Sequence, residues 1–169
     1  MNERRTWTAL SVIVAGALVL GSCEDDDLLA PGVEEFEATL TGGAEVPART
    51  TTASGSATFD VDDGTVSWSL TVSDISNVTA AHIHGPAAPG ENAGVLVTLV
   101  ASGPLTGTRT GSFTLPDAGA SVTTLDALLQ LMRSGQAYVN VHTNDGVAPE
   151  NTGPGDFPGG EIRGQIQER

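Results

Sequence analysis

The chain has 169 residues, of which 21 are acidic and seven are basic, and its formal net charge is −14. So acidic a chain offers no cationic surface for phosphates, which argues against nucleic acid as a partner. Its length suits one ordinary domain with a leader and a tether. Frequent glycine and short apolar runs between turn residues favour an all-β domain. The single cysteine excludes an intramolecular disulfide.

The N-terminal segment is typical of an exported protein. Arg4 and Arg5 precede an apolar run over residues 9–20, which is too short for a comfortable transmembrane helix. The four residues ending at Cys23 resemble a bacterial lipobox. That resemblance implies that residues 1–22 are a signal peptide, and that Cys23 becomes the lipid-modified first residue of the mature chain. An uncleaved anchor, or an ordinary signal peptide with an incidental cysteine, is the alternative.

Residues 23–34 are expected to form a flexible tether. Four acidic residues at 24–27 repel one another, which keeps this segment extended and solvated. Removal of residues 1–22 leaves 20 acidic residues against 5 arginines, a net charge of −15. We therefore expect a lipid-anchored protein of the bacterial cell envelope, on the periplasmic side or at the cell surface, whose partners are the membrane and an extracytoplasmic protein or metal ligand.

From residue 35 onward the hydrophobic pattern has a period of two, which is typical of strands with one buried face. Asp62-Asp63-Gly64 reads as a hairpin turn between two such strands. Residues 95–100 are almost wholly apolar, as in a strand buried on both faces. The alternating apolar sets are Phe36, Ala38 and Leu40; then Ala57, Phe59 and Val61; then Val66, Trp68, Leu70 and Val72.

All three histidines lie in predicted strands. His82 and His84 are two residues apart, so they project from the same face, while Ile83 points into the core. His142 lies in a later strand over residues 137–143, with Val139 and Val141 inward. If the two strands are neighbours, the three imidazoles meet.

One helix is predicted near the end of the domain, after a short strand over residues 111–115. Thr123 is its expected N-cap, and Gly135 is its expected C-terminal stop. A last strand over residues 161–166 turns Ile162 and Ile166 inward. About eight strands and one short helix indicate an antiparallel Greek-key sandwich or partly closed barrel over residues 35–169. The apolar helical face consists of Leu125, Leu128, Leu129 and Met132.

Residues 35–167 resemble the CHRD domain, which occurs in the animal protein chordin and in many bacterial secreted proteins. The matching segments are LTGGAEVP at 40–47, AHIHG at 81–85, GQAYVNVHT at 135–143 and PGGEIRGQI at 158–166. This resemblance implies a β-sandwich module outside the cytoplasm, usually without an assigned activity.

A fainter resemblance is to copper–zinc superoxide dismutase, another Greek-key β fold. There, a His-x-His strand and a later histidine-bearing strand supply copper ligands, and His82, His84 and His142 would take those places. The chain departs from that pattern because it has no histidine left to bridge copper to zinc and no second cysteine for a disulfide.

Two interpretations of the histidines remain open. Three neutral imidazoles suit Cu or Zn, and Glu161 could add an oxygen ligand or orient a histidine from behind. Alternatively, the histidines form a structural polar cluster with Asn140, Glu161 and Arg163. Glu161 and Arg163 share a strand face, which favours a plain surface ion pair. The acidic residues of the loop over 144–160 match no calcium-loop spacing.

The sequence thus supports two hypotheses of different kinds. The first is a lipid-anchored binding or structural module without catalytic activity. The second is a metal protein that binds one Cu or Zn ion through His82, His84 and His142. Redox or superoxide chemistry at that ion is an extension of this second hypothesis.

Overall fold

The computed structural model describes residues 33–117 and 120–169, so the predicted signal peptide, Cys23 and most of the tether lie outside the described residues. Among the described helices, none has the length and apolar character needed to cross a bilayer. The elements are β1 (Glu34–Thr41), η1 (Gly42–Ala44), β2 (Ser54–Asp62), β3 (Thr65–Ser73), β4 (Val78–His84), β5 (Val95–Val100), β6 (Gly107–Thr114), α1 (Leu125–Arg133), β7 (Tyr138–Thr143), β8 (Ile162–Gln165) and β9 (Gln167–Glu168).

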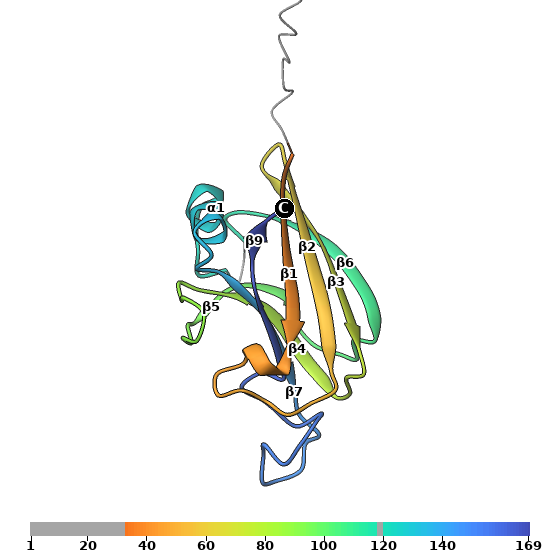
Figure 1. The fold of residues 1–169 in the computed structure, drawn as a ribbon. Coiled ribbons are helices and arrows are strands. Elements are labelled where there is room, and N and C mark those ends of the chain that lie inside the picture. The colour runs from red at the N-terminus through yellow and green to blue at the C-terminus, as the bar shows by residue number, and fades with distance from the viewer. Residues whose placement is uncertain (1–32, 118–119) are drawn as a thin grey trace, which may run out of the picture. The chain divides into compact units, whose positions relative to one another are not determined.

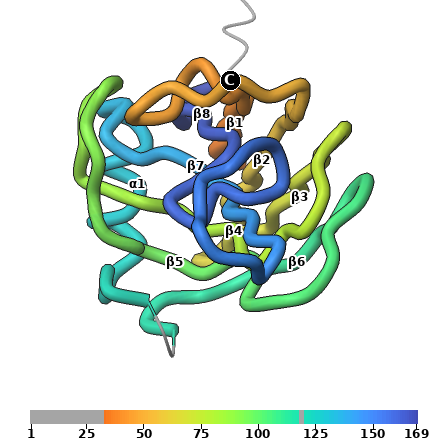
Figure 2. The backbone as a smooth tube through the Cα atoms, turned by 90° about the horizontal axis from the view of Figure 1, so that it is seen from below, coloured from red at the N-terminus to blue at the C-terminus, as the bar shows by residue number. Residues whose placement is uncertain are grey.

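The strands form one antiparallel sheet that is nearly closed into a barrel, as Figures 1 and 2 show. Its order is β5-β4-β7-β8-β1-β2-β3-β6, and the two-residue β9 also pairs with β1. Strands β4, β7 and β8 are therefore neighbours although they are far apart in the sequence. The predicted all-β fold, with one short helix over the described part of the chain, is confirmed.

Period-two burial explains why these segments are strands. In β3 the apolar residues are buried and alternate with more exposed serines and threonines, which places one face on the core. Asp63 and Gly64, with φ of 42° and 78°, make the two-residue turn between β2 and β3. Left-handed backbone at both turn positions matches the twist of the strands that they connect. The predicted hairpin is confirmed.

Helix α1 contributes Leu128, Leu129 and Met132 to the same hydrophobic core as the strands. Figures 1 and 2 place it on the side of edge strand β5, where the sheet is open. Just before the helix, the Ser121 amide donates to the Leu96 carbonyl of β5 at 3.0 Å, which gives this carbonyl of the edge strand a hydrogen-bond partner. The helix therefore covers the opening with its apolar face.

Two details of the prediction were wrong. The N-cap of α1 is Thr124, whose hydroxyl accepts from the Ala127 amide at 3.3 Å, and not Thr123. Strand β6 begins at Gly107 rather than Gly111. Its first half is polar and exposed because it lies at the free edge of the sheet, so it has no apolar alternation to reveal it. The expected stop at Gly135 is confirmed by its φ of 66°.

Candidate functional site

The candidate site lies on the outer face of β4, β7 and β8. Val139 and Val141 of β7 point into the core, so Tyr138, Asn140 and His142 take the other face. The register sets His84 opposite Tyr138 and His82 opposite Asn140 on one side of β7. Strand β8 lies on its other side. This pairing brings residues from three distant segments of the chain onto one surface.

The structure brings all three predicted histidines together. One nitrogen from each of His82, His84 and His142 lies within 4.8 Å of the other two. Ring centroids are 5.5 Å apart for His82 and His84, 5.0 Å for His82 and His142, and 5.5 Å for His84 and His142. Within residues 33–117 and 120–169, this is the one group of histidine, cysteine and acidic residues at metal-ligand spacing.

Backbone carbonyls fix the tautomers of two of these rings. His84 Nδ1 lies 3.0 Å from the Ala93 carbonyl oxygen, and His142 Nδ1 lies 2.9 Å from that of Pro158. A carbonyl oxygen only accepts, so both Nδ1 atoms carry the hydrogen. In the two neutral rings, each Nε2 therefore carries no hydrogen and presents a lone pair. These two Nε2 atoms face each other at 3.3 Å, where neither can donate to the other.

Burial keeps the rings neutral. Burial first, and then the neighbouring His142 and His84, lower the pKa of His82 to about 4. Burial also lowers the pKa of His84 and of His142, against the opposing hydrogen bonds from their carbonyl partners. His82 Nδ1 is buried and has no hydrogen-bond partner among the described residues. The cluster therefore holds two Nε2 lone pairs and one unpartnered Nδ1, on His82, that the surrounding protein does not satisfy.

The spacing of these nitrogens fits a tetrahedral metal ion. Two nitrogens about 2.0–2.1 Å from zinc at the tetrahedral angle are separated by about 3.3 Å. The Nε2 atoms of His84 and His142 are already 3.3 Å apart. Three imidazoles suit Zn or Cu, and a three-ligand set leaves a coordination position open. His84 and His142 could thus hold an ion with little movement, and His82 could supply a third nitrogen.

A second layer of contacts holds the rings in place. Tyr138 stacks on His84, with centroids 5.1 Å apart and an interplanar angle of 10°. The Tyr138 hydroxyl accepts from the Ala93 amide at 3.0 Å and donates to the Ala93 carbonyl at 3.3 Å. The Ala93 carbonyl therefore fixes both rings of the stacked pair. Such outer contacts orient metal-binding histidines.

Glu161, considered in the sequence as a ligand or a residue behind the metal, hydrogen-bonds to threonines and a backbone amide. Its carboxylate accepts from the Thr51 hydroxyl at 2.6 Å, the Thr143 hydroxyl at 2.7 Å and the Gly155 amide at 2.8 Å. None of its hydrogen bonds among the described residues goes to a histidine. Glu161 instead joins two covering loops to the sheet.

The expected surface ion pair of Glu161 and Arg163 was wrong. Glu161 is 0% exposed and Arg163 is 1% exposed. The ion pairs found within the described residues involve only Arg133 and Arg169 as cations. Loops over residues 42–53, 85–94 and 144–160 supply the contacts that enclose this face. The period-two pattern identified the face correctly but gave no sign that loops cover it.

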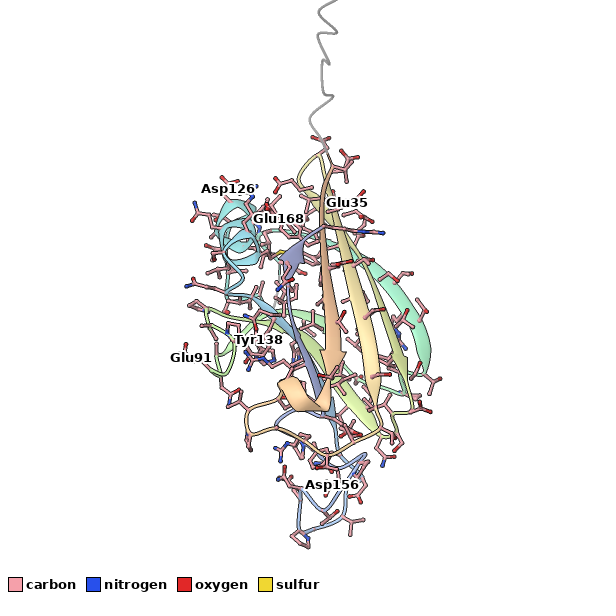
Figure 3. The ribbon with its side chains drawn as sticks, in the orientation of Figure 1. Glu35, Glu91, Asp126, Tyr138, Asp156 and Glu168 are labelled. Carbon is pink, nitrogen blue, oxygen red and sulfur yellow. The ribbon has the colours of Figure 1, made fainter. Side chains whose placement is uncertain are left out.

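The carboxylates of the 144–160 loop do not converge either. Asp156 is buried and accepts from the Thr152 amide and hydroxyl, both at 2.9 Å. The labelled Glu35, Glu91, Asp126 and Glu168 lie on exposed positions around the domain, as Figure 3 shows, whereas Tyr138 lies inside. The exterior is thus acidic, while the histidine cluster is sheltered.

The four segments quoted from the sequence meet around this face. They supply Glu45 beside η1, the histidines of β4, the outward residues of β7, and Arg163 of β8. A family model described as the CHRD domain matches residues 36–166. The chain belongs to the CHRD-domain family. No curated protein matches the chain. Its CHRD domain is therefore the barrel itself, with the histidine cluster on the outer face.

Proposed function

We propose that the protein is a non-catalytic CHRD module, held in the bacterial cell envelope by a lipid on Cys23, that binds one copper or zinc ion through His82, His84 and His142. Membership of the family supports a binding or structural module. The lipobox and the acidic tether support the anchor.

One observation carries the metal proposal. The Nε2 lone pairs of His84 and His142 face each other at 3.3 Å, while their Nδ1 hydrogens are held by the carbonyls of Ala93 and Pro158. Two lone pairs at this distance repel unless a cation lies between them. A purely structural polar cluster would place a donor in that contact. When bound, an ion would supply a positive centre for an exogenous ligand at its open position.

Metal content tests this proposal directly. The full chain, purified in detergent and stripped with a chelator, is dialysed against Zn²⁺ or Cu²⁺, and bound metal is measured by elemental analysis. We expect one equivalent per chain, and loss of that equivalent in His84→Ala and His142→Ala. The control is Thr98→Ala, because Thr98 is exposed and pairs with His82 across β4 and β5 without belonging to the cluster.

Two outcomes would contradict the proposal. One is the absence of stoichiometric metal in the unaltered chain. The other is unchanged metal in a variant that carries all three His→Ala substitutions. Circular dichroism of each variant shows whether the barrel has formed, so that loss of metal is not confused with loss of fold.

The anchor has its own test. We expect Cys23→Ala to move the protein from the membrane fraction to the soluble fraction of bacterial cells, because lipid attachment requires the cysteine thiol. A Ser22→Ala variant keeps a small residue before the cysteine and should remain membrane-bound. Membrane retention of Cys23→Ala would contradict lipid anchoring.

A further inference from the structure

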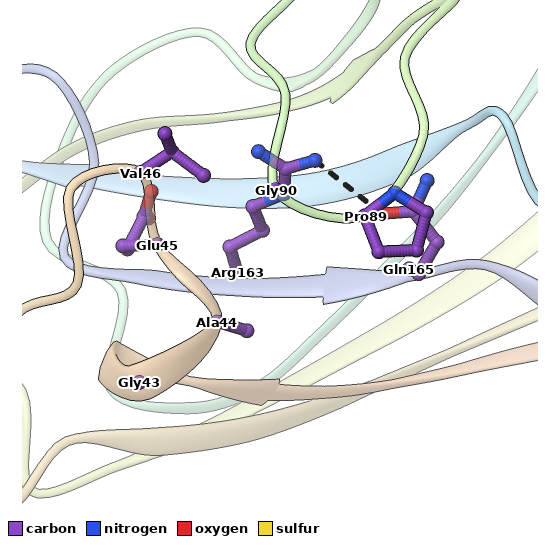
Figure 4. A pocket seen from close by; sticks show the side chains of 8 residues that line it. All are labelled: Gly43, Ala44, Glu45, Val46, Pro89, Gly90, Arg163 and Gln165. Atoms are coloured by element: carbon purple, nitrogen blue, oxygen red, sulfur yellow. Dashed lines mark hydrogen bonds between the residues drawn. The ribbon is translucent and has the colours of Figure 1, made fainter.

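A cavity of about 230 Å³ lies beside the histidine site, on the β8 side of Tyr138. Figure 4 shows Arg163 rising from β8 between Glu45 and Val46 on one side and Pro89 and Gly90 on the other. The lining residues are Gly43, Ala44, Glu45, Val46, Pro89, Gly90, Arg163 and Gln165.

Arg163 is a buried cation at this cavity. Its side chain is 1% exposed, and its guanidinium carbon lies 3.5 Å from the centre of the Tyr138 ring. Its hydrogen bonds go to the amide oxygens of Asn92 at 3.3 Å and Gln165 at 3.4 Å. Both bonds are long, and both acceptors are neutral. Tyr138 therefore lies between the imidazole of His84, on β4, and this guanidinium, on β8.

A buried charge is normally compensated. Arginine keeps its charge inside proteins, and an ion taken from water without a counter-ion costs several kcal/mol in general. Within residues 33–117 and 120–169, no carboxylate forms an ion pair with Arg163. The aromatic face of Tyr138 offsets part of the cost. A negative charge is still missing on the side of the cavity.

Glu45 is the acidic residue in the cavity wall, and it does not supply that charge by direct contact. It is 5% exposed, and its Oε1 has no hydrogen-bond partner among the described residues. Burial raises the pKa of Glu45 to about 7, although the charge of Arg163 opposes the rise. A protonated Glu45 adds a donor to the cavity rather than a counter-charge.

We propose that this cavity binds a small-molecule monocarboxylate, with Arg163 as its cationic partner. A guanidinium can pair with both oxygens of a carboxylate, which here would replace the long bonds from its two terminal nitrogens to Asn92 and Gln165. The single guanidinium charge of Arg163 balances a monoanion but not a dianion such as phosphate. The volume of about 230 Å³ lies below the range of about 300–1,000 Å³ for drug-sized ligands. The ligand class is therefore an acid of only a few carbon atoms.

The test uses the full chain in detergent with a chelator present, so its outcome does not depend on the metal proposal. Acetate, propionate and sulfate are titrated separately at constant ionic strength and pH 6. Binding is followed by calorimetry and by near-ultraviolet circular dichroism. Tyr138 is the chain's single tyrosine, but Trp7 and Trp68 absorb in the same region, so calorimetry decides the outcome and the dichroism change supports it. We expect saturable binding of one acetate or propionate, with a change in the tyrosine band.

Three variants make the test specific. Arg163→Met keeps the length of the side chain and should abolish the binding. Ala44→Asp changes an exposed residue of the cavity wall and should weaken binding at least tenfold, because it places a competing carboxylate there. Ala101→Asp adds the same charge at an exposed position outside the cavity wall and should leave binding unchanged.

Because Ala44 is exposed, its variant keeps the test decisive even if Arg163→Met fails to fold. The proposal is overturned if neither carboxylate binds saturably, or if Ala44→Asp binds acetate as the unaltered chain does. It is also overturned if sulfate binds as tightly as acetate, because the site would then be a general anion site.

Discussion

Glu45 and the histidines illustrate how burial, as the largest cause, sets opposite pH responses in one small region. Burial disfavours the charged form of each group, so it raises the pKa of the carboxyl and lowers those of the imidazoles. In the folded state Glu45 stays protonated to a higher pH than in the unfolded state, and the histidines stay neutral to a lower pH. The two kinds of group therefore change the free energy of unfolding in opposite directions as pH rises over the same range.

The first prediction concerns Glu45. The unfolded carboxyl loses its proton near pH 4.5, and the folded one keeps it to about pH 7. The native state holds the extra proton in this window, so the contribution of Glu45 to stability is lost as pH rises through it. Glu45→Gln mimics the protonated acid. We expect it to raise the free energy of unfolding at pH 8, relative to its effect at pH 4, by on the order of 1–3 kcal/mol.

Urea unfolding of both proteins at the two pH values measures this difference. Glu91→Gln is the control, because Glu91 is exposed. An equal effect of Glu45→Gln at pH 4 and pH 8 would show that the folded carboxyl has an ordinary pKa.

The second prediction concerns His82 in the metal-free protein. Its pKa is about 4 when folded against 6.5 when unfolded, so the unfolded state binds the extra proton between these values. Its contribution is fully present above pH 6.5 and is lost as pH falls toward 4. We expect His82→Gln to make the free energy of unfolding less steeply dependent on pH in this window. Unchanged steepness in urea unfolding from pH 4 to pH 7 would contradict the assignment.

At the scale of elements, the covering loops depend on Glu161. Its carboxylate joins Thr51, in the loop after η1, and Gly155, in the loop after β7, to the sheet. Hydrogen bonds to a buried charged acceptor stabilise more than neutral ones. The loop after β7 also holds the Pro158 carbonyl against His142, so its order decides how well that ring is oriented.

The third prediction follows from this anchor. Glu161→Gln replaces one accepting oxygen by a donor, so a threonine hydroxyl must turn to accept, and the hydrogen bonds lose their carboxylate acceptor. We expect a loss of about 2–4 kcal/mol in the free energy of unfolding, and faster hydrogen exchange in the loop over residues 144–160. Glu150→Gln in the same loop is exposed and should change neither quantity. Equal behaviour of the two variants would show that Glu161 does not anchor the loop.

The fourth prediction concerns the start of α1. The hydroxyl of Thr124 caps the helix by accepting from the Ala127 amide at 3.3 Å. Thr124→Ala should therefore lower the free energy of unfolding by about 1 kcal/mol, which is the usual value of such a cap. Thr123→Ala, one residue earlier, should have almost no effect. If thermal or urea unfolding showed a larger loss of stability for Thr123→Ala than for Thr124→Ala, Thr123 would be the cap.

At the scale of the whole molecule, the features that could be predicted from the sequence are those that follow from hydrophobic periodicity. Alternation in β3 and the i, i+2 spacing of His82 and His84 both follow from the two-residue repeat of a strand, and the leucines of α1 follow from the helical repeat. The convergence of the histidines also required β4 and β7 to be neighbours. That pairing depends on the topology of the sheet, so the meeting of the histidines was predicted only on the condition that the two strands are neighbours.

The remaining parts of the site could not be predicted because their cause is non-local. Arg163 alternates with core residues and therefore looked solvent-exposed, but loops from distant segments bury it. The carbonyls of Ala93 and Pro158 fix the tautomers of the histidines, yet every residue has a carbonyl and none is marked in the sequence. Burial by loops and contacts from backbone atoms leave no periodic trace.

The position of β7 between β4 and β8 has a consequence for folding. A slip of one residue in the pairing of β7 would turn Val139 and Val141 outward and would carry His142 and Tyr138 into the core. The apolar interior and the histidine cluster would then be lost in the same step. If the proposed metal site is correct, metal uptake would report that this strand has found its native partners, and a misaligned molecule would bind no metal.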